Sequence, residues 1–313
     1  MNLDGLRPWA GLAGNVVQDD ADIVIAGIPY DGSAVYRKGA SIAPRTIRQL
    51  SAAMPPVTED GHLMTALRVR DIGDLDPGRD IEAGWMTVAE RLADVPPESF
   101  LTVLGGDHCT AISTLAAQVR RHPGFHLLWV DAHPDLCDFS RGGHWTCGCA
   151  LRRALEASGI EPSRVVIAGG RDFDPEELEF IKANGILLVS TLELAQDLPG
   201  ASRRIAERLS GHQVHVSFDI DVLDPAFAPG TEIPSAGGLS TRQALALLRS
   251  VSDGAELIGL DVVEVSPPVD NADITTLAAL KVIFEVWGMA KAARLAQQAD
   301  AGRAQGAPTD GKR

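Results

Sequence analysis

Short apolar runs alternate with amphipathic stretches along most of the chain. The apolar runs have the length of β-strands and are nearly continuous in Val, Ile, Leu and Phe, which is typical of strands covered on both faces. We predict strands at Asp22–Ile28, Phe100–Leu104, Phe125–Asp131, Arg164–Ala168, Ile186–Ser190, Gln213–Ile220 and Glu256–Val263, with a weaker candidate at Arg68–Ile72. The amphipathic stretches predict helices at Pro44–Ala52, Ile81–Leu92, Thr110–Arg121, Ala150–Ser158, Pro175–Ala183, Ser202–Leu209, Thr241–Val251 and Ile274–Leu295. This order predicts an α/β fold, a mostly parallel eight-stranded sheet with helices on both faces.

The 313 residues are expected to form one domain followed by a short tail. No linker rich in Gly, Ser or Pro divides the middle of the chain, so we assign 1–296 to a single domain. Residues 297–313 are rich in Ala, Gln, Gly, Asp and Lys and are predicted to be disordered. The apolar runs are shorter than the roughly 20 residues of a membrane helix, and the N-terminus lacks the pattern of a secretory signal. We expect a cytoplasmic protein that does not enter a membrane.

The formal net charge of −14 limits the partners of the chain. Proteins that bind nucleic acid neutralise phosphates with clusters of Lys and Arg, and this sequence has no basic stretch. A small cationic substrate is compatible with the acidity, although solubility alone also explains it. The charge therefore argues against nucleic acid and leaves the substrate open.

Clusters of Asp and His follow three of the predicted strands. They are GGDH at 105–108, DAHPD at 131–135 and DIDVLDP at 219–225. Because ligands collect at the carboxyl ends of the strands in such a sheet, we expect the three segments to lie together. Each motif alone also fits a glycine turn, a helix cap or a polar loop. Three of them at strand ends favour one shared site.

The charges of this predicted site favour two metal ions. Buried carboxylates are costly unless a counter-charge compensates them. Four aspartates supply four negative charges, which two divalent cations would balance, and two histidines supply neutral ligands: Asp131, Asp135, Asp219, Asp221, His108 and His133. Carboxylate with imidazole suits Mn²⁺, Ni²⁺, Co²⁺ or Zn²⁺ better than Ca²⁺. The balance favours a two-metal centre over a single ion.

The three motifs, in this order, resemble the signatures of the ureohydrolase (arginase/agmatinase) family. The segment SFDIDVLDPAFAPGTEIPSAGG at 217–238 keeps the spacing of the longest family signature. The stretch GIPYDGSAVYRKGASIAPRTIRQLS at 27–51 is similar to the opening of agmatinases, and DVVEVSP at 261–267 is similar to the last family motif. The resemblance extends over residues 22–288.

The resemblance implies a three-layer arginase/deacetylase-type fold and two metal ions per subunit, with manganese favoured and nickel as the alternative. It implies that the six Asp and His residues named above hold the metals and that a bridging hydroxide attacks the guanidinium carbon, giving a tetrahedral intermediate that collapses to urea and an amine. Asp135 and Glu264 are assigned to catalysis. Glu264 matches the family residue that pairs with the guanidinium, whose fork of N–H donors suits a planar carboxylate. Relatives form trimers or hexamers, so we expect a homo-oligomer, with a hetero-oligomer as the alternative.

The stretch GHWTCGCAL at 143–151 departs from the family pattern. The family has a loop histidine here that is thought to shuttle protons to the leaving amine. Alignment on Gly148 puts Cys147 in its place, while His144 lies three residues earlier and is the other candidate. Histidine is better poised near neutral pH than an unperturbed thiol, whose pKa is about 8.5. We hypothesise that Cys147 marks a non-standard substrate, because all six ligand positions are intact and formimidoylglutamases hydrolyse with a serine there.

The segment GTEIP at 230–234 also departs from the family, which usually has Gly-Thr-Gly-Thr-Pro. Ile233 removes a hydroxyl that helps frame the guanidinium pocket, and Glu232 adds a carboxylate; both suit an alkylated guanidine or a second cationic group. The alternative is that Glu232 faces solvent. Asp174 either helps to hold the substrate, as an acidic residue does in arginases, or caps the helix that follows it. Residues 136–140 lack the Asn with which arginases grip the amino-acid carboxylate, which argues against arginase itself.

We therefore predict an agmatinase-like hydrolase of a guanidino compound, with agmatine, guanidine, a guanidino acid and an alkylated guanidine or biguanide as candidate substrates. The alternatives are a formimidoylglutamase-like amidine hydrolase and a non-catalytic partner subunit of a hetero-oligomeric ureohydrolase. Cys147 as a covalent nucleophile would leave the six ligand-type residues without a function. A zinc site from Cys137, His144, Cys147 and Cys149 has a spacing that fits no common structural zinc pattern.

Overall fold

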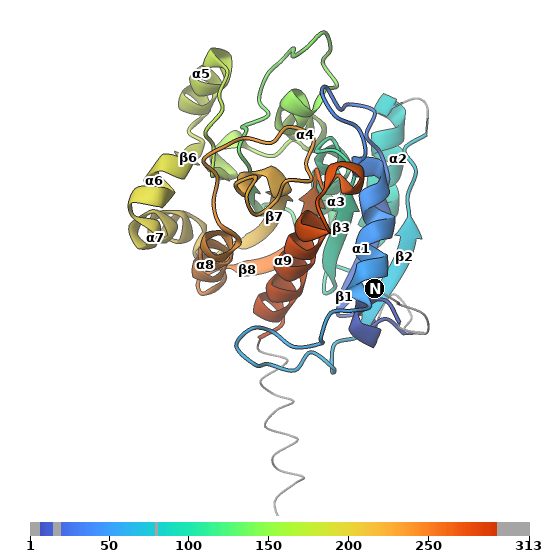
Figure 1. Cartoon of the computed structure of the whole chain (residues 1–313). Helices are drawn as coiled ribbons and strands as arrows, with labels where there is room; N and C mark the ends of the chain where they lie inside the picture. The colour runs from blue at the N-terminus through green and yellow to red at the C-terminus, as the bar shows by residue number, and fades with distance from the viewer. Residues whose placement is uncertain (1–6, 15–19, 79–80, 293–313) are drawn as a thin grey trace, which may run out of the picture.

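A single sheet of eight parallel strands runs through the centre of the molecule (Figure 1). The computed structural model describes residues 7–14, 20–78 and 81–292. The strand order is β2-β1-β3-β8-β7-β4-β5-β6, and each neighbouring pair is parallel. The strands are β1 (Ile23–Ile28), β2 (Val69–Asp74), β3 (Phe100–Gly105), β4 (His126–Val130), β5 (Val165–Ala168), β6 (Leu187–Val189), β7 (Gln213–Asp219) and β8 (Glu256–Val263).

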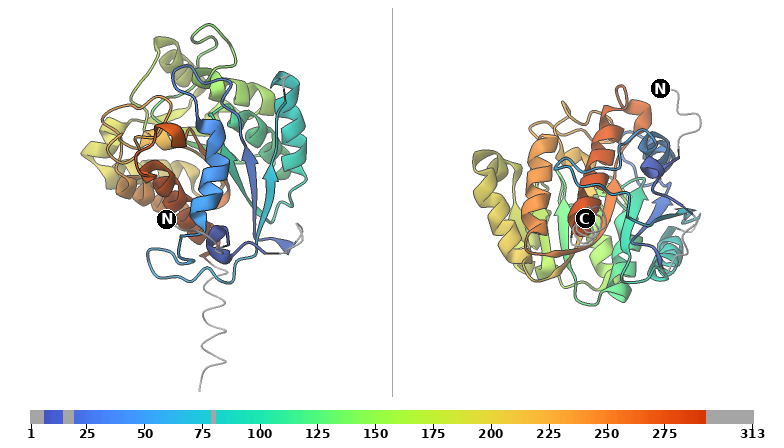
Figure 2. Two further views of the ribbon diagram at one scale, coloured as in Figure 1. Left: turned by 45° about the vertical axis from the view of Figure 1, so that its right-hand side comes forward. Right: turned by 90° about the horizontal axis from the view of Figure 1, so that it is seen from below.

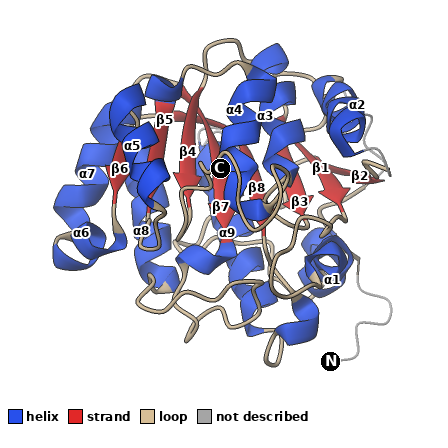
Figure 3. Ribbon diagram, turned by 90° about the horizontal axis from the view of Figure 1, so that it is seen from above, coloured by secondary structure: helices blue, strands red, loops and turns tan. Residues whose placement is uncertain are grey.

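Helices cover both faces of the sheet and give the molecule three layers (Figures 2 and 3). One face carries α1 (Ala43–Ser51), α7 (Leu198–Leu209), α8 (Thr241–Ser252) and α9 (Ile274–Ala290), and the other carries α2 (Ile81–Ala93), α3 (Thr110–Arg121) and α4 (Ala150–Ser158). Two further helices are α5 (Pro175–Asn184) and α6 (Thr191–Gln196). Short 3-10 helices lie at Trp9–Gly11, Ala40–Ile42, Cys147–Cys149, Pro162–Arg164, Ile220–Val222 and Pro267–Val269. None of the helices in the described part of the chain has the length and apolarity that crossing a membrane requires.

The two faces of the sheet form two apolar cores, because successive side chains of a strand point to opposite faces. In β4, Leu128 and Val130 belong to the core beneath α1, α7, α8 and α9, whereas Leu127 and Trp129 belong to the core beneath α2, α3 and α4. All four side chains have no exposed surface. This two-sided burial explains why the strands appear in the sequence as unbroken apolar runs.

The predicted strands and the three-layer arrangement are confirmed, with differences at the helices. The sequence analysis does not predict α6, which has only six residues and is defined mainly by a capping box that begins at Ser190. Helix α7 begins at Leu198 instead of Ser202, because the side chain of Asp197 accepts a hydrogen bond from the first turn. The predicted disordered tail, 297–313, lies outside the described residues.

The chain order of the strands places a crevice at the middle of the sheet. Strands β1 to β3 occupy one half and β4 to β6 the other, while β7 and β8 fill the space between them. The loops after β3 and β4 lead to α3 and α4 on one face of the sheet, whereas the loops after β7 and β8 lead to α8 and α9 on the other face. Ligands bind in α/β sheets where neighbouring loops diverge in this way. The carboxyl ends of four neighbouring strands, β3, β8, β7 and β4, meet at this crevice.

We expect the substitution Leu260→Ala to lower the free energy of unfolding by about 2 to 5 kcal/mol. Leu260 lies in the central strand β8 with no exposed surface, so truncation leaves a cavity that the neighbouring strands cannot fill. Unfolding in urea measures the loss. The control is Leu192→Ala on α6, whose side chain is 66% exposed and whose truncation should change stability by less than about 0.5 kcal/mol. Equal effects of the two substitutions would contradict this description of the core.

Candidate active site

The turn after β3 carries His108 into the crevice. The Gly106 N–H donates to the carbonyl of Ile28 at 2.8 Å. A Cβ at Gly106 would overlap the Tyr30 carbonyl, so the close approach requires glycine. The His108 ring is fully buried and stacks on Trp129 with ring centroids 3.8 Å apart and planes 4° from parallel. The GGDH motif thus fixes both the position and the plane of this imidazole.

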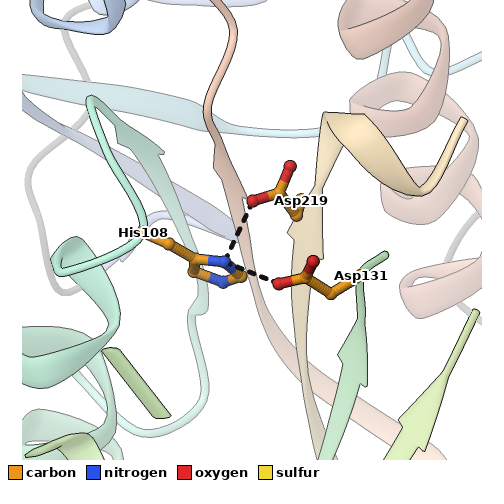
Figure 4. Close-up of side chains that lie close together, drawn as sticks. All are labelled: His108, Asp131 and Asp219. Atoms are coloured by element: carbon orange, nitrogen blue, oxygen red, sulfur yellow. Dashed lines mark ion pairs between the residues drawn. The ribbon is translucent and has the colours of Figure 1, made fainter. Parts of the chain in front are cut away.

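Three carboxylates converge on the Nδ1 atom of His108, and Figure 4 shows two of them, Asp131 and Asp219. The distances from Nδ1 are 2.9 Å to Asp131 Oδ2, 3.0 Å to Asp219 Oδ2 and 3.4 Å to Asp135 Oδ2. On the other side of the ring, Nε2 lies 3.0 Å from Ser217 Oγ. This hydrogen bond leaves Nδ1 free to serve as a ligand if Nε2 carries the proton.

A second group of ligand atoms surrounds the Nδ1 atom of His133. Asp221 Oδ2 lies 3.0 Å from it and Asp131 Oδ1 lies 3.5 Å from it. Asp131 therefore belongs to two groups, His108–Asp131–Asp219 and Asp131–His133–Asp221, and each could hold one metal ion. The structure brings together five of the six predicted ligands in these groups and places Asp135 beside the first of them.

Backbone N–H groups fix the carboxylates in the turns after β4 and β7. Asp131 Oδ1 accepts from the His133 N–H at 2.7 Å, and Asp219 Oδ1 accepts from the Asp221 N–H at 2.7 Å. The Asp221 carboxylate accepts from the Ala132 N–H at 3.2 Å, which ties the two turns together. Asp135 has a φ of 54°, in the left-handed region that non-glycine residues rarely adopt. Such strain, about 1 to 3 kcal/mol, persists where the surroundings over-determine the conformation.

The electrostatics of these groups favour bound cations. Burial and the charge of Asp131 raise the pKa of Asp135 well above its ordinary value, and burial and the charge of Asp221 do the same to the pKa of Asp219. The buried atoms His108 Nδ1 and Asp131 Oδ2 lie 2.9 Å apart but lack the geometry of a hydrogen bond, and neither bonds to another of the described residues. Buried carboxylates and orphaned ligand atoms at this spacing are what divalent cations compensate. The donor set of imidazole nitrogens and carboxylate oxygens fits a first-row transition metal such as Mn²⁺.

Glu264 joins the turn after β3 to the end of β8. Its N–H donates to the Gly106 carbonyl at 2.9 Å, and its Oε1 accepts from the His108 N–H at 2.8 Å. Its φ of 62° also lies in the left-handed region. Burial, followed by the charges of Asp219 and Glu232, raises the pKa of Glu264 well above its ordinary value. Its second oxygen, Oε2, is buried and has no hydrogen-bond partner in the part of the chain that the structure describes.

A cavity of about 310 Å³ lies over these groups. The metal side of its wall contains His133, Asp135, Asp219 and Asp221, and the remaining wall includes Glu264, Cys147, Glu232, Ile233 and Asp174. Arg141 is the one Lys or Arg among the described residues of this wall. The cavity thus places the predicted substrate residues around the predicted metal ligands, in strongly acidic surroundings.

Cys147, and not His144, lies at this cavity. The Cys147 side chain lines the wall, and the residue is 8% exposed. Burial, together with the charges of Glu264 and Glu232, raises the pKa of Cys147 far above the ordinary thiol value. The His144 side chain is 52% exposed, its Nδ1 donates to the Asp138 carbonyl at 2.7 Å, and it is absent from the described cavity wall. Of the two predicted proton carriers, only the thiol faces the site, and it faces it in the neutral form.

The three remaining predicted substrate residues also reach the cavity. Glu232 is 2% exposed, so the alternative that it faces solvent is wrong. Ile233 contributes apolar wall beside it. Asp174 begins the capping box of α5, as predicted, because the Glu177 carboxylate accepts from its N–H at 2.8 Å. The cap accounts for the position of Asp174 without a substrate, yet its side chain still borders the cavity.

The sequence analysis missed a buried polar chain behind His108. Ser217 Oγ lies 3.4 Å from Asp261 Oδ2, which lies 3.2 Å from His215 Nε2. Gln118 Nε2 continues the chain to His215 Nδ1 at 2.8 Å. All of these residues have no exposed surface. The one signal in the sequence is a polar residue inside an otherwise apolar strand, as in VHVSF and GLDVV.

Comparisons with known proteins agree with this geometry. Residues 21–288 match the model of the arginase family. The chain is 36% identical to guanidinopropionase of Pseudomonas aeruginosa over 84% of each chain, and 34% identical to an agmatinase of Neisseria gonorrhoeae over 86% of this chain and 87% of that protein. The solved structure of proclavaminate amidinohydrolase from Streptomyces clavuligerus superposes with a TM-score of 0.82 at 31% identity, covering 91% of this chain and 97% of the other.

We expect the thiols of the folded protein to resist alkylation at pH 7.5. All four cysteines are free and buried, and the raised pKa of Cys147 keeps its thiol protonated, whereas the thiolate is the reactive form. Iodoacetamide labelling followed by mass spectrometry should show Cys147 reacting at least about 100-fold more slowly than in the urea-unfolded chain, in which all four thiols are accessible. Rapid, selective labelling of Cys147 in the folded protein would show instead that it is an activated nucleophile.

Proposed function

Because the chain belongs to the arginase family and is therefore a hydrolase of amidino or guanidino C–N bonds, we propose that it uses two divalent metal ions to hydrolyse a small guanidino compound to urea and an amine. The observation that carries the proposal is the pair of ligand groups that share Asp131 directly beneath an acidic cavity. A guanidinium is the cation whose planar fork of N–H donors best matches the carboxylates there.

The residues proposed to hold the metals are His108, Asp131, Asp135 and Asp219 for one ion and Asp131, His133 and Asp221 for the other. Manganese is the favoured metal and nickel the alternative, since both accept mixed imidazole and carboxylate ligands. Two divalent cations, when bound, supply the Lewis acidity that brings the pKa of water toward neutrality. His133 lines the cavity, so we propose that the substrate approaches the metal ions from the side of His133.

The side chains around the cavity have separate tasks in this proposal. Glu264 pairs with the guanidinium through its free Oε2, because its Oε1 is already held by the His108 N–H. Asp135 reaches from the first ligand group into the cavity, so we assign it as the acceptor of the proton that leaves the attacking water. The apolar wall at Ile233 accommodates alkyl groups of the substrate. Cys147 is assigned to hydrogen bonding with the leaving amine, as a neutral thiol.

We expect turnover to depend on metal ions. The purified chain, loaded with Mn²⁺ or with Ni²⁺, should release urea from at least one member of a panel that contains agmatine, guanidine, methylguanidine, biguanide and 3-guanidinopropionate. Removal of the metals by a chelator should abolish urea release, and elemental analysis should find about two ions per chain in the loaded protein. The variant Asp131→Asn should retain less than one ion, because Asp131 belongs to both ligand groups. Turnover that survives complete chelation would overturn the proposal.

A second test separates the two candidate proton carriers. If Cys147 serves the leaving amine, Cys147→Ala lowers kcat at least about tenfold while metal content stays unchanged. His144→Ala should change kcat less than about twofold, since that side chain lies outside the cavity wall. Urea release under saturating substrate measures both. Unaltered turnover in Cys147→Ala would remove Cys147 from the mechanism, and a large loss in His144→Ala would return the role to the histidine.

A further inference from the structure

Glu232 lies beside Glu264, because Thr231 pairs with Val265 in an antiparallel bridge, and it repeats the arrangement found at Glu264. Glu232 Oε1 accepts hydrogen bonds from two backbone N–H groups, those of Val35 and Tyr36, the latter at 2.8 Å. Its Oε2 is buried and without a hydrogen-bond partner among the residues that the structure describes, like the Oε2 of Glu264. The residues are 2% and 4% exposed, respectively, and both line the cavity. Two carboxylates therefore each present one fixed oxygen to the backbone and one unused oxygen to the site.

A purely structural role for Glu232 explains the hydrogen bonds of its Oε1 but not the burial of its Oε2. Its Oε1 anchors the loop at 35–36, and that task requires one acceptor oxygen. A neutral amide would serve the loop equally well, whereas an unpaired buried carboxylate oxygen is costly. The cost is recovered when a donor-rich cation enters and pairs with the free oxygen. The second oxygen therefore points to a bound ligand.

The charges of the site lead to the same conclusion. The four aspartates of the ligand groups balance two divalent cations, so Glu232 and Glu264 remain as two further buried carboxylates. Their charges lie close enough for Glu232 to affect the ionisation of Glu264. A bound cation with donors on two edges can pair with both carboxylates at once. A cation that paired with only one of the two carboxylates would leave the charge of the other one uncompensated.

We propose that Glu232 and Glu264 form a two-armed clamp that selects compact guanidinium-type cations whose N–H groups are unsubstituted on two edges. This inference rests on the proposed function. Guanidinium itself and biguanide belong to the class, because each presents forks of N–H donors on more than one edge. An alkyl group fits only on an edge that neither carboxylate occupies, where Ile233 and Val35 provide an apolar wall.

The mouth of the cavity disfavours substrates that carry a carboxylate. Asp172 and Asp174 line the cavity, and Arg141 is the one Lys or Arg among the described residues of its wall. The tail of an ω-guanidino acid would therefore lie near two exposed negative charges, whose repulsion is partly screened by water and salt. We expect such acids to be poorer substrates than guanidinium or biguanide.

The substitution Glu232→Gln tests the clamp without disturbing the loop. The glutamine carbonyl oxygen still accepts from Val35 and Tyr36, while the charge and the free acceptor are removed. We expect kcat/KM for guanidinium and biguanide to fall about 10- to 100-fold, with most of the change in KM. For 3-guanidinopropionate the loss should be smaller, because the same substitution relieves repulsion of its carboxylate. The matched control is Glu179→Gln, which removes the same charge from the exposed side of α5.

Calorimetry with acetamidinium provides a measurement that does not depend on turnover. Its two amino groups present a fork of N–H donors on one edge and a single N–H on each flanking edge, so it can still donate to both carboxylates. Glu232→Gln should weaken its binding to the metal-loaded protein at least about tenfold, whereas Glu179→Gln should not. Equal losses for all substrates in Glu232→Gln, or unchanged acetamidinium binding, would overturn the clamp and leave Glu232 as a loop anchor. If the unsubstituted protein hydrolyses no member of the panel, the proposed function fails, and acetamidinium binding alone then decides the clamp.

Discussion

The structure depends on the burial of four aspartates within a few ångströms of one another. Negative charges this close repel, and burial removes the water that would screen them. Backbone N–H groups hold three of the carboxylates, those of Asp131, Asp219 and Asp221, and imidazole nitrogens lie beside them. The proposed cations would compensate the remaining negative charge. The tight turns after β3, β4 and β7, the left-handed backbone at Asp135 and the glycine at Gly106 belong to the same arrangement.

Much of this could be predicted from the sequence because local patterns determine it. Buried strands produce apolar runs, and the ligand motifs follow those runs directly, so the sheet and five of the clustered ligands are found without coordinates. The orientation of Cys147 and His144 could not be found, since it depends on the path of a loop. The burial of Glu232 depends on contacts with a segment almost 200 residues away in the chain, at Val35 and Tyr36. Spacing along the chain contains no record of such contacts.

The metal groups and the substrate wall are built from different parts of the fold. The proposed ligands stand on turns directly attached to the central strands, whereas Glu232 and Ile233 stand on a loop and Cys147 on a short 3-10 helix that follows a loop. Loops accept substitutions that strands do not. This division allows the wall of the cavity to vary independently of the proposed metal-binding residues, so the substrate is the property most open to change.

A chain of buried polar groups connects the imidazole of His108 to the interior of the sheet. From Ser217 it passes through Asp261 and His215 to Gln118, whose Oε1 accepts from Arg121 at 2.6 Å. Arg121 in turn donates to three carbonyls at the amino-terminal edge of the sheet, those of Val95, Pro96 and Ser99. The proposed cations, by binding the native fold alone, would stabilise that fold by linkage, and this chain of polar groups connects their site to the opposite edge of the sheet.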